Sequence, residues 1–194
     1  VHKKYGEATA VLAGNSLLTL AFEIISHGKN LLSSNKKIEI INLLSNCSGH
    51  TGIAGGQELD LKFENKKKGI NQILSMQRKK TGKLFNFCFR SVAIVANKSN
   101  KDKEYFGRLG EEVGLLFQLS DDFLDLRGSK KLVGKPIKKD KKKGKSNLVN
   151  LIGYENSLKY AENLEKKILL KLSKHGKNAF DLINTIKFIN ERNF

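Results

Sequence analysis

Three carboxylates stand close together in an apolar stretch of the chain. Asp121, Asp122 and Asp125 occupy positions i, i+1 and i+4 of the run 117–126. Successive residues of a helix step by about 100°, so the acids and Gln118 share one side, with Asp122 at its edge. The opposite side is apolar: Leu116, Leu119, Phe123 and Leu126. Clustered carboxylates need neutralising, and Mg²⁺ prefers such hard oxygen ligands together with substrate phosphates. The pattern predicts a magnesium site, and the alternative is an acidic turn facing solvent.

A cation and a hydroxyl stand together in a second motif, Lys80-Thr81-Gly82. It interrupts a long helix predicted over 70–95, and threonine followed by glycine is unfavourable in a helix interior. Breaks of this kind often mark a kink or a functional site. Lys80 and Thr81 could therefore bind an anion, or the motif could be a loop between two helices.

A glycine- and lysine-rich stretch without apolar periodicity follows the acidic run, over 127–145. It is predicted to be a loop that contains Gly134-Lys135, Asp140 and Gly144-Lys145-Ser146. One interpretation is a solvated basic loop. The other is a lid that brings ammonium groups to bound phosphates and excludes water.

A glycine cluster precedes two further polar candidates, Gln57 and Asp60. Its members are Gly49, Gly52, Gly55 and Gly56. No strand pattern precedes the cluster, so it differs from a nucleotide-binding glycine loop, and it indicates a turn or a close helix crossing. Gln57 and Asp60 could line a site or belong to a helix surface.

The net charge is +17, from 36 basic and 19 acidic residues. Such an excess suggests an anionic partner, either nucleic acid or a diphosphate, although a coding bias toward lysine would give the same composition. The aromatic residues lie at core spacings without a stacking platform, which argues against nucleic acid.

The two cysteines, Cys47 and Cys88, show no metal-binding spacing and are predicted to be buried free thiols in a reducing compartment. We find no apolar run of membrane-spanning length and no signal peptide, and we expect no membrane span.

Helical periodicity recurs along the whole chain, and no segment alternates convincingly with period 2. The fold is therefore predicted to be all-α, as one domain over residues 1–194. The expected helices cover 7–25, 36–47, 70–95 with its break, 103–126, 148–172 and 178–189.

Taken together, these motifs closely resemble the trans-prenyl diphosphate synthases, and most closely the bacterial farnesyl/geranylgeranyl diphosphate synthase branch. The matching segments run in order along the chain: 5–14, 55–60, 80–82, Phe117-Gln118 with Asp121-Asp122 and Asp125, 134–135 and 144–146. The resemblance implies an antiparallel helical bundle of the isoprenoid synthase type around a deep central cavity, a homodimer, and a cytoplasmic enzyme. It also implies Mg²⁺-dependent condensation of an allylic diphosphate (dimethylallyl or geranyl) with isopentenyl diphosphate.

The resemblance also implies roles for individual residues. Asp121, Asp122 and Asp125 would form the family's second aspartate-rich motif, with Asp121 the principal metal ligand. Lys80 and Lys135 would grip the allylic diphosphate, and Thr81 and Gln118 would place oxygens near the developing cation. The remaining assignments complete the substrate site: Lys145 closing it, Asp140 supporting it, and Gln57, Asp60 and Phe117 lining it.

Departures from the family concern the beginning of the chain. The first aspartate-rich motif, the arginines that follow it and the upstream isopentenyl diphosphate groups are absent, and we expect them before Val1 in a longer parent. The parent is then the active enzyme and this fragment is inactive. Asn15 stands where the family commonly has Asp, at a helix-packing position. The alternatives are a non-catalytic prenyl-synthase-like partner subunit and a basic nucleic-acid-binding protein.

Overall fold

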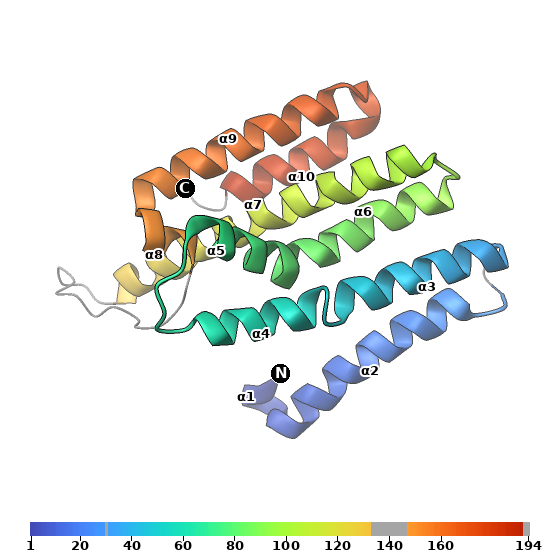
Figure 1. Cartoon of the computed structure of the whole chain (residues 1–194), viewed down its shortest axis with the longest axis horizontal. Helices are drawn as coiled ribbons and strands as arrows, with labels where there is room; N and C mark the ends of the chain where they lie inside the picture. Colours follow the sequence, from blue (N-terminus) through green and yellow to red (C-terminus); the bar gives the residue numbers. More distant parts are fainter. Residues whose placement is uncertain (30, 133–146, 192–194) are drawn as a thin grey trace.

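The computed structural model describes residues 1–29, 31–132 and 147–191 (Figure 1). The described chain is helical and contains no strand, which confirms the all-α prediction. In chain order the helices are α1 (His2–Tyr5), α2 (Glu7–Ser26), α3 (Ser34–Ser48), α4 (Ile53–Phe63), α5 (Ile70–Gln77), the π-helix η1 (Arg78–Gly82), α6 (Lys83–Val95), α7 (Asn100–Leu132), α8 (Leu148–Ile152), α9 (Tyr154–Ser173), the 3-10 helix η2 (Gly176–Ala179) and α10 (Phe180–Glu191).

Helix α7 is the central element of the bundle. It packs against α6 and η1 on one side and against α9 and α10 on the other (Figure 1). At its start the Ser99 hydroxyl accepts a hydrogen bond of 3.2 Å from the backbone N–H of Asp102, which satisfies one of the free donors of a helix N-terminus. The helix begins at Asn100 and ends at Leu132, so it is longer at both ends than the predicted 103–126.

The apolar side of α7 forms the core with α9 and α10. Leu116, Leu119 and Phe123 are fully buried there, together with Ile168 and Ile186. The buried Ser120 hydroxyl donates a hydrogen bond of 2.7 Å to the backbone carbonyl of Ile189 and ties α7 to α10. Burying this side leaves the acidic side of α7 facing η1 and α5.

Glycines bring α6 and η1 unusually close to α7. A Cβ on Gly110 would lie 2.4 Å from the Phe85 carbonyl oxygen, and a Cβ on Gly114 would lie 2.8 Å from Cα of Gly82. Real side chains do not approach backbone this closely, so only glycine permits this packing. The recurrence of glycine at 107, 110 and 114 is therefore a close-packing edge.

Two long predicted helices are divided in the structure. The predicted break at Lys80-Thr81-Gly82 falls in the π-helix η1, which joins α5 and α6 without a loop. The predicted helix 148–172 is instead split into α8 and α9 by Gly153, whose φ of +84° lies in the left-handed region that favours glycine.

Helix α2 lies at the outer edge of the bundle beside α3, and none of its residues is buried (Figure 1). It is 20 residues long and contains an 18-residue window with a mean hydropathy of 1.6, so length and composition alone would allow a membrane span. The prediction that the sequence contains no apolar run of membrane-spanning length was therefore wrong. Core helices of soluble proteins and signal sequences share this length and composition.

The two thiols are both free, as predicted, but only one of them is buried. Cys47 lies in the core, whereas Cys88 is exposed. The prediction of a buried Cys88 was wrong because the apolar residues around it do not all face inward. Leu84 and Val92, one turn to either side of Cys88 on α6, are exposed too.

Candidate active site

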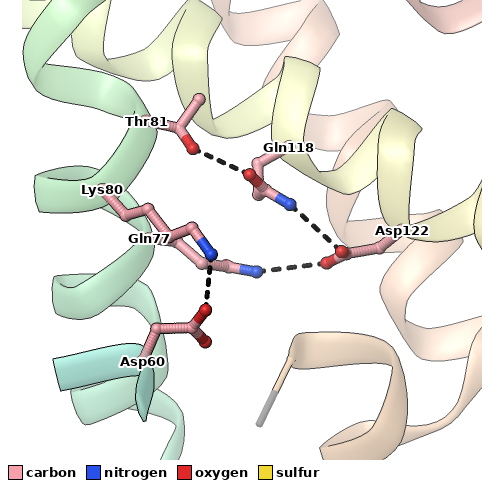
Figure 2. Close-up of polar contacts among 6 residues, drawn as sticks. All are labelled: Asp60, Gln77, Lys80, Thr81, Gln118 and Asp122. Atoms are coloured by element: carbon pink, nitrogen blue, oxygen red, sulfur yellow. Dashed lines mark hydrogen bonds and ion pairs between the residues drawn. The ribbon is translucent and has the colours of Figure 1, made fainter. Parts of the chain in front are cut away.

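A chain of hydrogen bonds links α5 and η1 to the acidic side of α7. The Thr81 hydroxyl donates to Gln118 Oε1 at 2.7 Å, and Gln118 Nε2 donates to Asp122 Oδ1 at 3.1 Å (Figure 2). On the other side, Gln77 Nε2 donates to Asp122 Oδ2 at 3.2 Å. Asp122 is only 7% exposed, so its carboxylate is held between two amides in a largely desolvated place.

Close helix packing explains how these side chains meet. Gln118 and Asp122 are one turn apart on α7 and therefore project from the same side. Gly82 and Gly114 allow η1 to approach α7, which brings Thr81 within reach of Gln118. The wider π turn changes the direction in which residues of η1 project compared with a continuous α-helix.

An ion pair extends the site toward α4. Lys80 Nζ on η1 bonds to Asp60 Oδ2, with 34% and 21% of the two side chains exposed (Figure 2). A Cβ on Gly56 would lie 2.2 Å from the backbone N of Lys80, so this glycine lets α4 approach η1 one turn before Asp60. Gly56 thus marks a close helix crossing, whereas Gly49 and Gly52 lie in the turn between α3 and α4, so both predicted alternatives are found within the cluster.

The other sequence-predicted residues are distributed unevenly. Gln57 is exposed on α4, whereas Asp60 is half-buried and contacts Lys80. Phe117 is half-buried, and its ring centroid lies 5.6 Å from that of Phe85. Lys135 and Lys145, like Asp140, lie outside the described residues.

The three acids differ in their surroundings. Asp122 is buried, Asp121 is half-buried and Asp125 is exposed. Among the described side chains, no group of three or more Asp, Glu, His or Cys is gathered into a preformed metal site. The donor chemistry nevertheless fits Mg²⁺, because three carboxylates project within an arc of about 100° and one of them is oriented by two amides.

Sequence reasoning missed Gln77, which contacts Asp122 directly. The residue is 3% exposed and ends α5, immediately before η1. A glutamine between Met76 and Arg78 has no distinctive spacing. The one available signal was its position three residues before Lys80, which places it on a neighbouring face of the same helix.

A separate pocket of about 400 Å³ lies between α3 and α6. Lys83, Asn86 and Arg90 contribute to its wall, and none of the predicted site residues does. Lys83 Nζ contacts Glu111 Oε1 at 2.6 Å, so part of this charge is already neutralised. We place the candidate site at Asp122 rather than here, because the residues of the acidic run and of Lys80-Thr81-Gly82 meet there and none of them lines this pocket.

Comparisons with known proteins agree with this arrangement. The chain is 38% identical over 157 residues to farnesyl diphosphate synthase of Bacillus subtilis, covering 80% of this chain and 53% of that protein. It is 34% identical to farnesyl diphosphate synthase of Escherichia coli, covering 99% and 66%.

Solved structures show the same fold. An FPP/GFPP synthase of Zymomonas mobilis superposes with a TM-score of 0.82 at 30% identity, covering 97% of this chain and 63% of that one. A geranyltransferase of Helicobacter pylori, complexed with magnesium and isoprenyl diphosphate, gives a TM-score of 0.76 at 30% identity, covering 99% and 60%.

The helical bundle and its carboxylate-bearing helix therefore define the isoprenoid synthase class of fold. The family description "Polyprenyl synthetase" matches residues 1–186, and the chain belongs to this family. The chain spans about half to two thirds of the length of the relatives reported above.

Proposed function

We propose that the chain is the diphosphate-binding part of a Mg²⁺-dependent prenyltransferase that condenses an allylic diphosphate with isopentenyl diphosphate. The observation that carries the proposal is the hydrogen-bonded sequence Thr81–Gln118–Asp122, next to the ammonium group of Lys80. The names of the relatives, farnesyl diphosphate synthase and geranyltransferase, support the same reaction class.

The reaction begins with ionisation of the allylic substrate. Asp121, Asp122 and Asp125 would hold Mg²⁺, which when bound neutralises the diphosphate leaving group. Lys80 and Lys135 both bind the outer oxygens of the diphosphate. When the ligand binds, Lys80 leaves Asp60 and contacts the diphosphate instead. The two ammonium groups stabilise the negative charge that develops on the diphosphate as the C–O bond breaks.

The carbocation must then be held without reacting with water. Thr81 and Gln118 present oxygen atoms that stabilise positive charge at the allylic carbon, while apolar walls that include Phe117 exclude solvent. Isopentenyl diphosphate attacks the cation, a new C–C bond forms, and the released diphosphate accepts the proton that the product loses. Lys145 closes the site during this step, and Gln57 and Asp60 line its wall.

The remaining parts of the proposal concern assembly. We infer a cytoplasmic homodimer in which a second copy covers the apolar, unburied surface of α2, where Val11, Leu12, Leu17 and Ile24 are exposed. An exposed apolar surface of this extent marks an interaction site more often than a solvated face. Sedimentation analysis tests the dimer: a purely monomeric protein contradicts it.

The experiment that tests the function is a product assay on a protein that carries this chain together with the family's first aspartate-rich motif. With dimethylallyl or geranyl diphosphate plus isopentenyl diphosphate, we expect elongated diphosphates that require Mg²⁺. Asp121→Ala abolishes product while the circular dichroism spectrum stays helical. Glu104→Ala, an exposed acid at the far end of α7, is the matched control and retains activity. Turnover in Asp121→Ala contradicts the metal role.

A non-catalytic partner subunit is the alternative. It predicts diphosphate binding without turnover until a second, different synthase subunit is added. Product formed by the single protein excludes it.

A further inference from the structure

Gln77 has an unusual hydrogen-bonding state for a buried side chain. Its Nε2 donates to Asp122 Oδ2, but its Oε1 has no hydrogen-bond partner within the described part of the chain. It is the sole buried side-chain N or O atom in that part without one. A buried acceptor left unsatisfied costs free energy, so a native structure that keeps one requires an explanation.

The amide orientation is fixed by the carboxylate beside it. Turning the amide over would place Oε1 against the Asp122 oxygen, where two acceptors repel, so the donor must face Asp122. Gln118 supplies the other donor from within α7 itself. Because the two amides come from different helices, the plane of the Asp122 carboxylate is held between them.

We propose that Gln77 is a positioning residue for the magnesium site, orienting Asp122 through Nε2 and offering Oε1 to a metal-bound water. The inference rests on the proposed function, since it takes Mg²⁺ with a diphosphate as the ligand. Mg²⁺ usually keeps several waters, and these waters are hydrogen-bond donors, the partner that Oε1 lacks. Residues that orient metal-ligating carboxylates typically change metal affinity about 10- to 100-fold when removed.

The test measures two affinities separately by isothermal titration calorimetry on the full chain. Mg²⁺ is titrated into protein saturated with inorganic pyrophosphate, and pyrophosphate is titrated into protein without Mg²⁺. Gln77→Met keeps the length of the side chain and removes both polar atoms of the amide. Asn71→Leu, which removes an exposed amide from the same helix, is the matched control.

We expect Gln77→Met to weaken Mg²⁺ binding about tenfold or more while Mg²⁺-free pyrophosphate affinity stays unchanged. Asn71→Leu changes neither. A merely structural role for Gln77 would instead lower both affinities together with the melting temperature, and that result overturns the inference. Gln77→Asn, whose amide is one methylene too short, gives the same loss and serves if Gln77→Met does not fold.

Failure of the inference and failure of the proposed function give different results. If the unaltered chain binds Mg²⁺ with pyrophosphate and Lys80→Ala weakens pyrophosphate binding, the proposed function stands. Equal Mg²⁺ affinity in the unaltered chain and Gln77→Met then removes the positioning role alone. If the unaltered chain does not bind Mg²⁺ in the presence of pyrophosphate, the result contradicts both the proposed function and the positioning role of Gln77.

Discussion

The Thr81 hydroxyl lies 2.7 Å from Gln118 Oε1 and joins the π-helical turn η1 to α7 at the centre of the candidate site. Both side chains are half-buried, and glycines allow η1 and α7, which carry them, to pack closely. The same amide then donates to Asp122. Thr81 therefore fixes which end of the Gln118 amide faces the acid.

Thr81→Val removes the hydroxyl and keeps the branched shape. We expect the free energy of unfolding to fall by about 1 kcal/mol, because a part-buried acceptor loses its donor. Urea denaturation followed by circular dichroism measures the change. Thr81→Ser, which retains the hydroxyl, is the control, and a Val variant no less stable than the Ser variant argues against the bond.

Gly110→Ala adds a methyl group where α7 meets α6. Because its Cβ would lie 2.4 Å from the Phe85 carbonyl oxygen, the two helices must separate, and we expect a loss of about 1–3 kcal/mol in stability.

Gly14→Ala is the matched control for this change, on α2. No atom of the same chain lies within 4 Å of its added Cβ, so we expect the monomer to gain about 0.5–1 kcal/mol from helix propensity. Denaturant midpoints compare the two variants, and a gain in stability for both contradicts close packing at Gly110.

Glu112 connects α7 to α9 and gives stability a pH dependence. Burial raises the pKa of its carboxyl, but hydrogen bonds from Lys171 at 2.6 Å and Lys167 at 2.9 Å outweigh burial and lower the pKa below its ordinary value. A carboxyl with a depressed pKa in the folded state stabilises the protein above its unfolded-state pKa. This contribution is lost as the pH falls through the folded-state pKa.

Glu112→Gln should therefore cost about 1 kcal/mol at neutral pH and progressively less on acidification. Denaturation midpoints between pH 7 and pH 3 test this. A cost that stays constant or grows as the pH falls would show that the ion pair is not its source.

The two thiols should differ in their reaction with a thiol reagent. Desolvation raises the pKa of both Cys47 and Cys88, so access rather than thiolate content separates them. We expect exposed Cys88 to react in the native protein and Cys47 to react only after unfolding. Cys88→Ser removes the fast phase seen with Ellman's reagent, and a fast phase that persists in this variant contradicts the assignment.

Much of the fold could be predicted because helix periodicity and glycine spacing are local signals. The glycine cluster before Gln57 and the break at Lys80-Thr81-Gly82 were both visible in the sequence. The division at Gly153 was missed, since one glycine in an apolar pattern does not reveal a positive φ. The exposure of α2 was missed too, because burial depends on which other surfaces are present to pack against it.

The candidate site was predictable in the residues that belong to motifs, and Gln77 was not predictable. Lys80, Thr81 and Gln118 carry a recognisable order and spacing, and the structure brings Thr81 and Gln118 together. Gln77 has no such pattern, and its role depends on how far η1 lies from α7. The predictions for Lys135 and Lys145 stay predictions.

The π-helical turn also constrains how the length of this helix can vary. Bonds from i to i+5 accommodate one residue more than an α turn does. Deleting one residue within 78–82 would let the helix close as regular α-helix, with α5 and α6 near their present relative orientation, because the π turn has already absorbed the additional residue. Deleting one residue from α5 or α6 would instead rotate the two ends of the helix by about 100° relative to each other and carry Gln77 away from Asp122. A single-residue deletion is consequently less damaging to the helix packing at the π turn than in the α-helices on either side of it.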